Sequence, residues 1–226
     1  MNGINTFPED ERTGPGILKQ IIMKEGINTK ELIINNSNLT NLKSLPNCIG
    51  KLENLETLIL HNFSGLESLP ETIGNLSKLT KLKLKGCSGL ESLPGTIGNL
   101  SKLTELSLGG CSGLVSLPGT IGNLSKLTEL SLGGCSGLES LPGTIGNLSE
   151  LIFFNIFGCS GLQRLPGTIQ NLNKLENWIM NREPYENTEN ETVMRQKLKT
   201  ISVCSKKGIF IMRNGERIIY PPSTST

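Results

Sequence analysis

A chain of 226 residues has room for one large domain or two small ones, and its net charge of +2 is too small to attract nucleic acid or a membrane surface by itself. Aromatic residues make up 4% of the chain, whereas a globular enzyme of this size usually contains more. The apolar residues are mostly Leu and Ile, which indicates one short pattern repeated many times.

Residues 1–29 precede the repeated part and are predicted to form an N-terminal cap. Residues 1–12 (MNGINTFPEDER) contain no basic segment followed by an apolar core, so we expect no secretory signal and a cytoplasmic location. No window approaches 18 uninterrupted apolar residues, so the sequence predicts no membrane span. Residues 14–25 (GPGILKQIIMKE) are typical of an amphipathic helix, which we expect to cover the first edge of the repeats.

Residues 30–181 repeat at a fixed interval. A Leu-Pro pair recurs every 24 residues, from Leu45-Pro46 to Leu165-Pro166. Residues 95–118 and 119–142 differ at one position only, where Val115 corresponds to Glu139. Self-similarity of this kind predicts a stack of equivalent units.

Within one unit the apolar spacing changes from that of a strand to that of a helical turn. Leu82 and Leu84 alternate with polar residues, as in a short strand. Pro94 suits the first turn of a helical segment, because no N–H is needed there. Apolar residues at a spacing of three then predict a short helix or 3-10 turn: Ile97, Leu100 and Leu103. Because one unit cannot bury its own apolar side, its neighbours must supply the core.

This unit, LxxLxLxxCxxLxxLPxxIGNL, resembles the leucine-rich-repeat family over about residues 30–181. It is similar to the repeats of plant intracellular resistance proteins and Ras-associated plant repeat proteins, and to repeat effectors that intracellular bacterial pathogens inject into host cells. The resemblance implies an α/β repeat fold: a right-handed leucine-rich-repeat solenoid of about seven units, with a concave parallel β-sheet and short helices or 3-10 turns on the convex side. It implies a scaffold rather than one chemistry.

Four cysteines recur at the same interval: Cys87, Cys111, Cys135 and Cys159. Metal ligands converge on one point, usually at short local spacing. These residues instead form a ladder with one cysteine per unit, about 4.8 Å apart like the strands they follow. We therefore predict reduced, buried, metal-free thiols that bond the backbone of the turn, and no cofactor. Phe63 takes the cysteine position in the second unit, which fits packing better than metal binding.

The sequence predicts no catalytic residue. A cysteine nucleophile needs a base beside it, but the single histidine, His61, lies on the second predicted strand while Cys204 lies near the C-terminus. Some bacterial repeat effectors carry a ubiquitin-ligase domain after the repeats. Residues 182–226 are too few for such a domain, so we predict that the chain is not an enzyme.

The outward positions of the predicted strands form the candidate protein-binding surface. Side chains alternate along a strand, so the inward leucines place their neighbours on the concave face. Seven strands at about 4.8 Å give a face roughly 30 Å wide, which suits an interface of about 800 Å² per partner. The candidate binding residues on it are His61, Lys81, Lys83, Lys85, Glu105, Glu129, Phe153, Asn155 and Phe157.

The charges on this face are unevenly distributed. We expect Lys81 to be neutralised by Glu105 on the next strand, and Lys83 and Lys85 to be unpaired cations. The alternative is an ordinary solvated charged face. Glu105 and Glu129 interrupt the continuous basic stripe that nucleic-acid binding requires.

Glycines and aromatic residues mark the C-terminal half of the face. Gly109 and Gly133 leave a bare strip where a partner can approach the sheet, unless the glycine pair is only a duplicated turn entry. Phe153 and Phe157 lie beside this strip, at positions where the two preceding units carry Glu and Gly. Exposed aromatic residues of this kind indicate a binding hot spot, with a cap loop folding over them as the alternative.

Residues 182–226 are predicted to form the C-terminal cap. Trp178 and Met180 occupy the strand-leucine positions of the last unit. A polar linker and a helix near residues 191–200 are expected after them. The segment GIFIMRNGERIIY then predicts a hairpin, with Asn214-Gly215 as a type I′ turn.

These patterns together predict a monomeric module that binds another protein, an enzyme or an effector, through its concave face. The resemblance to bacterial repeats implies an effector or effector regulator, delivered into a host cytosol, that inhibits a partner enzyme by occluding its active site. Neither nucleic acid nor a membrane is expected as a partner. The alternatives are a scaffold that joins two partners and a sensor fragment of an immune-type receptor.

Overall fold

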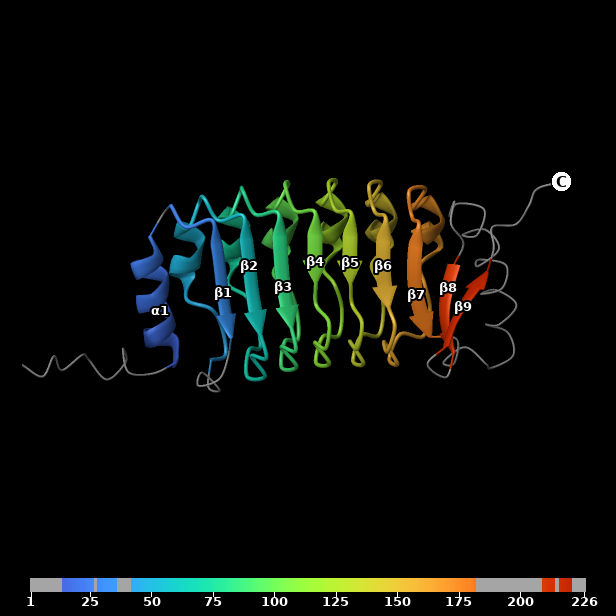
Figure 1. Cartoon of the computed structure of the whole chain (residues 1–226), viewed down its shortest axis with the longest axis horizontal. Helices are drawn as coiled ribbons and strands as arrows, with labels where there is room; N and C mark the ends of the chain where they lie inside the picture. The colour runs from blue at the N-terminus through green and yellow to red at the C-terminus, as the bar shows by residue number, and fades with distance from the viewer. Residues whose placement is uncertain (1–13, 27, 36–41, 182–208, 214–215, 221–226) are drawn as a thin grey trace, which may run out of the picture.

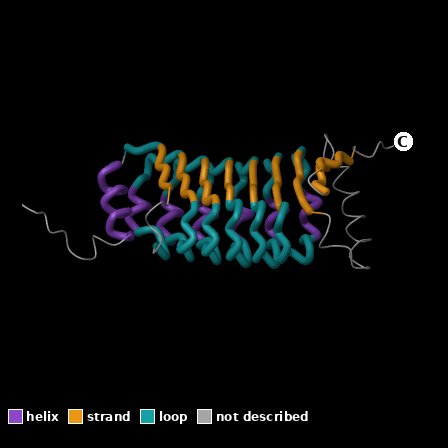
Figure 2. Tube along the Cα trace, turned by 60° about the horizontal axis from the view of Figure 1, so that its bottom comes forward, coloured by secondary structure: helices purple, strands orange, loops and turns teal. Residues whose placement is uncertain are grey.

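The computed structural model describes residues 14–26, 28–35, 42–181, 209–213 and 216–220. Within these ranges the chain forms one sheet with the strand order β1-β2-β3-β4-β5-β6-β7-β8-β9. Strands β1 to β7 are parallel and lie side by side in chain order, in a nearly straight row (Figure 1). Figure 2 shows the strands along one long side of the molecule and the helices on another.

The seven parallel strands have the alternating burial that their sequences predict. They are β1 (Glu31–Asn35), β2 (Thr57–His61), β3 (Lys81–Lys85), β4 (Glu105–Ser107), β5 (Glu129–Ser131), β6 (Phe153–Ile156) and β7 (Asn177–Asn181). From β2 onward, paired residues lie one 24-residue coil apart, as Leu58 with Leu82 and Leu82 with Leu106. Equivalent side chains of successive coils therefore form columns across the sheet.

Each coil returns through a 3-10 helix that begins directly after a proline. These helices are η2 (Asn47–Lys51), η3 (Glu71–Asn75), η4 (Gly95–Asn99), η5 (Gly119–Asn123), η6 (Gly143–Asn147) and η7 (Gly167–Asn171). Pro94 stands at the N-cap of η4, with an extended ψ of 151°, and not in the first turn as predicted. The reason is that its carbonyl oxygen accepts the first hydrogen bond of the turn, from the N–H of Ile97 at 3.0 Å.

Backbone contacts between the 3-10 helices set the spacing of the coils. A Cβ atom at Gly98 would lie 2.6 Å from the carbonyl oxygen of Thr120, so glycine lets the two coils come together there. The hydroxyl of Thr120 donates a hydrogen bond to the carbonyl of Gly95 at 2.7 Å. On the other side of each coil, Thr104 and Thr128 donate to the backbone carbonyl 24 residues earlier, each at 3.0 Å. Neighbouring coils are thus joined by side chains as well as by the sheet.

The first edge of the stack carries helix α1 (Gly14–Glu25), with the bounds that the sequence predicts. Leu18 and Ile22 are fully buried, and they belong to the same apolar core as the leucines of the coils. Figure 1 shows α1 alongside the first coil. The helix supplies the apolar contacts that a preceding coil would otherwise provide.

At the other end, β8 (Ile209–Arg213) pairs in parallel with β7, and β9 (Glu216–Tyr220) pairs antiparallel with β8. This pairing agrees with the predicted hairpin, although its turn, Asn214-Gly215, lies outside the described residues. The predicted helix near residues 191–200 also lies outside them. Trp178 is buried at the expected leucine position and stacks on Phe154, with ring centroids 5.9 Å apart.

Candidate protein-binding surface

The outward side chains of β1 to β7 form a continuous surface, here called the strand face. On β3, Leu82 and Leu84 are fully buried while Lys81 and Lys85 are exposed, so the predicted alternation is observed. The register aligns the outward residues in three columns, and all nine candidate residues lie on this one face. The first column contains Lys81, Glu105, Glu129 and Phe153, the middle column Lys83, Ser107, Ser131 and Asn155, and the end column His61, Lys85, Gly109, Gly133 and Phe157.

Glu105 pairs with Lys83 and not with Lys81, so the predicted pairing is wrong. The Lys83 Nζ lies 2.6 Å from Glu105 Oε1, with the two side chains 33% and 20% exposed. Lys81 faces Glu105 directly in the register, but it is exposed at the start of its strand. Side chains in a strand lean along the strand direction, which favours the diagonal pair. This pair is also better shielded from water, and shielding strengthens the attraction.

Lys81 and Lys85 lie at opposite margins of the face, and the acids share the margin of Lys81. Among the described residues, Lys81 and Lys85 make no ion pair, and Lys85 lies in register with His61. Glu129 is exposed and lies in register between Glu105 and Phe153. Glu105 and Glu129 therefore lie in the first column, as does Glu31 of β1, whereas the end column from His61 to Phe157 carries basic, glycine and aromatic residues.

The predicted bare strip is open at Gly109 and covered at Gly133. A Cβ atom at Gly109 would meet only the carbonyl oxygen of Gly133, at 3.6 Å. At Gly133 it would lie 2.8 Å from Nδ2 of Asn155, so that amide lies over the glycine. Asn155 Oδ1 accepts a hydrogen bond from the backbone N–H of Phe157 at 2.9 Å, which holds the amide in place. The prediction of a strip open at both glycines is therefore wrong at Gly133.

Phe157 presents the largest apolar surface among the candidate residues. Its side chain is 44% exposed, whereas Phe153 is half-buried. The predictions from the sequence missed a further exposed residue, Ile152, which directly precedes Phe153 in the chain. Ile152 stands where the three preceding coils carry Thr80, Thr104 and Thr128, and this break in the column was the available signal. The aromatic end of the face thus includes an aliphatic neighbour on its margin.

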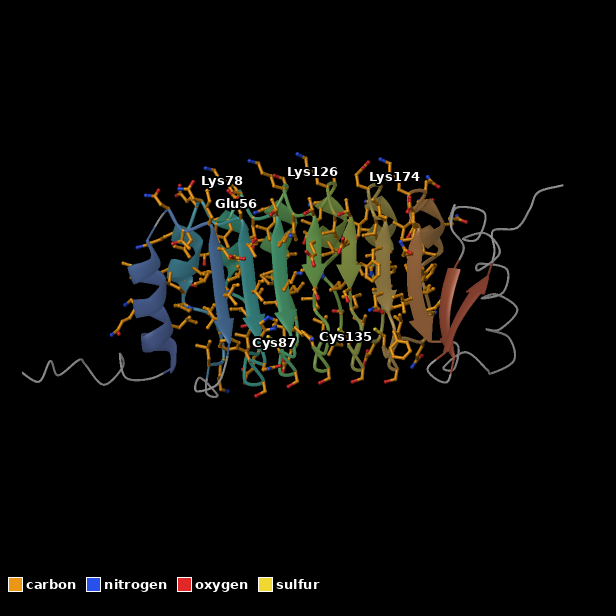
Figure 3. All side chains as sticks on the ribbon, in the orientation of Figure 1. Glu56, Lys78, Cys87, Lys126, Cys135 and Lys174 are labelled. Carbon is orange, nitrogen blue, oxygen red and sulfur yellow. The ribbon has the colours of Figure 1, made fainter. Side chains whose placement is uncertain are left out.

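The cysteine ladder lies inside the stack and belongs to the core. Cys111 donates its thiol hydrogen to the carbonyl oxygen of Leu84 at 3.1 Å, and Cys135 does the same to Leu108 at 3.2 Å. Burial raises the pKa of Cys135 to about 12 and that of Cys159 to about 11, so these thiols stay protonated. Figure 3 shows Cys87 and Cys135 near the ends of their strands, in equivalent places. The predicted backbone-bonding role is present in the structure.

Two further findings concern the described residues only. They contain no group of three or more His, Cys, Asp and Glu side chains placed to hold a metal ion. None of their helices is long and apolar enough to cross a membrane.

A parallel sheet of 24-residue coils, each closed by a 3-10 helix and packed around columns of leucine, defines a leucine-rich-repeat solenoid. Solenoids of this kind are typically binding scaffolds. The family model described as leucine-rich repeat region matches residues 32–114, and it confirms the resemblance that the repeat unit indicates. No curated protein matches the chain.

A solved structure of a similar protein confirms the fold class. The chain is similar to a leucine-rich-repeat protein of Leptospira interrogans, with 24% identity and a TM-score of 0.51 over 90% of this chain and 59% of that one. It therefore spans about three fifths of the length of that protein. Lower TM-scores relate it to the Arabidopsis receptor kinase HAESA, in complex with the peptide hormone IDA and the co-receptor SERK1 (26% identity, TM-score 0.47, 67% and 26% of the two chains), and to the leucine-rich-repeat domain of the type III effector XopL (27%, 0.40, 65% and 66%).

Proposed function

We propose that this chain is a non-catalytic module that binds another protein through the strand face. The observation that carries the proposal is Phe157, an aromatic residue 44% exposed in the same column as the open floor at Gly109. Large aromatic residues at accessible positions are the commonest anchors of protein interfaces. The frame beneath them is held by repeated hydrogen bonds, so little conformational freedom is lost on binding.

The face has a variable side-chain pattern on a constant frame. The buried leucine columns hardly change from coil to coil, whereas the outward residues change from Lys83 through Ser107 and Ser131 to Asn155. Solubility alone does not require unpaired cations together with an exposed phenylalanine. The free Lys81 and Lys85 supply electrostatic attraction, and Phe157 supplies apolar area. Lys83 and Glu105 largely satisfy each other and contribute less.

In its finer form, the proposal is that the chain is a monomeric bacterial effector or effector regulator. It acts in the cytoplasm, or in a host cytosol after delivery, and inhibits a partner enzyme by covering its active site. The support is the sequence resemblance to bacterial effector repeats and a face roughly 30 Å wide, which is broad enough to cover an active-site opening. The proposal includes no catalytic residue and no cofactor.

A scaffold or receptor-type sensor is the second candidate, and one observation favours a scaffold. Ile33 on β1 is 51% exposed on the same face and lies five strands away from the Phe157 end, so a second partner can bind at the N-terminal end of the face. The two functions differ in stoichiometry. An inhibitor of one enzyme forms a complex with one partner, whereas a scaffold forms a ternary complex that sedimentation velocity distinguishes.

The test of strand-face binding is affinity capture with the tagged full-length chain, from lysates of the source organism and of a host cell. Wild type is compared with Phe157→Ala and with Lys102→Ala. Lys102 occupies the same place in its coil as Lys78 and Lys126. In Figure 3 these two lysines project from the top edge of the molecule, where the strands begin. We expect a partner to be captured by wild type and Lys102→Ala and lost with Phe157→Ala. Loss with Lys102→Ala alone would place the interface elsewhere. A captured enzyme that stays fully active when saturated would reject inhibition.

A further inference from the structure

The end column of the strand face has a chemistry of its own. It runs from His61 and Lys85 over the glycines to Phe157, and neighbouring backbone groups bond directly, as Gly86 N–H to Gly109 at 2.8 Å. The acids of the face, Glu31, Glu105 and Glu129, lie in the first column, four residues earlier in their coils and outside this column. We call the end column between Lys85 and Phe157, with the Asn155 amide beside it, the trough. It has a cationic end, a low floor and an aromatic end.

The dimensions of the trough fit a short extended peptide lying across the strands. Lys85 and Phe157 are three strand spacings apart, which is about 14 Å. An extended chain rises about 3.3 Å per residue, so four residues cover about 13 Å. Side chains four residues apart in an extended chain point to the same side. One peptide can therefore direct a side chain to Lys85 and another to Phe157 without a bend.

The floor of the trough offers a hydrogen-bond donor to such a peptide. Asn155 uses its Oδ1 atom to accept the Phe157 N–H, and this leaves its Nδ2 group over Gly133. An amide nitrogen held in this way can donate to a peptide carbonyl oxygen. Gly109, next to it, has no side chain to keep the peptide backbone away from the sheet. The trough thus offers a cation and an aromatic ring to the peptide side chains, and an amide donor to the peptide backbone.

We infer that the trough binds an extended peptide segment with a carboxylate side chain at one position and an apolar, preferably aromatic, side chain four residues away. The carboxylate pairs with Lys85, next to His61, and the apolar side chain packs on Phe157. The residue between them, two positions from each, lies over the glycine floor. This inference rests on the proposed function and names the chemistry of its partner.

The test is selection from a phage-displayed library of random dodecapeptides on the immobilised full-length chain. We expect enriched peptides to share an Asp or Glu and an apolar residue at a separation of four. A synthetic peptide with the enriched sequence should lose at least tenfold in affinity, by fluorescence anisotropy, with Phe157→Ala. A second selection on Lys85→Glu should enrich Lys or Arg in place of the acid, at the same separation. Failure of this exchange would overturn the inference.

A matched pair of glycine substitutions tests the location of the bound peptide. At Gly109 a Cβ atom meets only one backbone oxygen, at 3.6 Å, so Gly109→Leu fits the fold and fills the trough. At Gly95, on η4, a Cβ atom meets nothing within 4 Å, so Gly95→Leu is the control. We expect peptide binding to fall at least tenfold with Gly109→Leu and to stay at the wild-type level with Gly95→Leu. Both variants should keep the wild-type melting temperature.

The outcomes separate this inference from the proposed function. If selected peptides bind Gly109→Leu as well as wild type, the strand face is not the site and both fail. If Gly109→Leu abolishes binding but the enriched peptides lack the acid-to-apolar separation, only the trough inference fails. A library that yields no enriched peptide also overturns the inference, while a folded partner for the strand face remains to be sought by affinity capture.

Discussion

The inward and outward residues of the same strands differ in how much they vary from coil to coil. Inward, one column reads Leu84, Leu108, Leu132 and Ile156, and all four side chains are buried. Outward, the adjacent column reads Lys83, Ser107, Ser131 and Asn155. Packing against two neighbouring coils restricts the inward residues to one shape, since interiors tolerate little change of volume. The outward residues face solvent, so they vary without loss of the fold. The fold therefore depends on the inward residues of each strand, and the proposed binding depends on the outward ones.

The largest expected difference between the two sides is chemical, in thiol reactivity. Only a thiolate attacks a disulfide reagent, and burial raises the pKa of Cys135 to about 12. Relative to an ordinary thiol, the thiolate population at pH 8 falls by about a thousandfold. We expect the four ladder cysteines of the native protein to resist a chromogenic disulfide reagent, and all six cysteines to react after denaturation. Rapid labelling of the ladder in native protein, or stoichiometric zinc by elemental analysis, would contradict a buried structural role.

Truncation of one inward residue should destabilise the protein strongly, whereas truncation of its outward neighbour should not. Leu106→Ala removes a buried side chain between two coils and should lower the free energy of unfolding by about 2–5 kcal/mol. Ser107→Ala, one residue later and outward, should stay within about 0.5 kcal/mol of wild type. Urea denaturation followed by circular dichroism measures both. Equal effects for the pair would mean that the two sides are not energetically separate.

Phe157→Ala should give the opposite result: binding is lost and stability is kept. A truncated aromatic anchor typically costs about 2–4 kcal/mol of binding free energy at a hot spot. The side chain is 44% exposed and lies outside the buried core, so the melting temperature should match wild type. Isothermal titration with a captured partner, together with differential scanning calorimetry, tests both halves of this prediction. Lower stability without weaker binding would assign Phe157 to a structural role.

Glycines of one coil should respond differently to the same substitution. Gly98→Ala brings a Cβ atom within 2.6 Å of the Thr120 carbonyl oxygen, and relief of this overlap should cost about 1–3 kcal/mol. Gly95→Ala, in the same 3-10 helix, meets nothing within 4 Å and serves as the matched control. Chemical denaturation of the two variants compares them directly. A neutral Gly98→Ala would show that the coils can move apart without loss.

The 24-residue period predicted the columns of this fold, because burial follows directly from spacing. It placed Leu82 and Leu84 inward and Lys81 and Lys85 outward, as observed. It could not predict in which direction the long side chains point beyond the sheet. The pairing of Glu105 with a diagonal neighbour and the position of the Asn155 amide over a glycine depend on rotamers and on competing hydrogen bonds. Alternation defines the face of the sheet, whereas side-chain torsions decide which groups on it stay free.

The ion pair on the face provides the smallest and most specific prediction. Lys83 and Glu105 are both mostly covered, so their attraction should exceed that of a fully exposed pair and still amount to no more than about 1 kcal/mol. A double-mutant cycle with Lys83→Ala and Glu105→Ala, followed by urea denaturation, measures this coupling. A second cycle with Lys81→Ala and Glu105→Ala should give a coupling near zero, although Lys81 is the direct neighbour of Glu105 in the register. In 1 M salt the first coupling should shrink only in part, because the charges are screened over about 3 Å where they meet solvent and both side chains are mostly covered. A larger coupling for Lys81 than for Lys83 would restore the pairing that the sequence alone suggested, and it would leave Lys83 free to meet a partner.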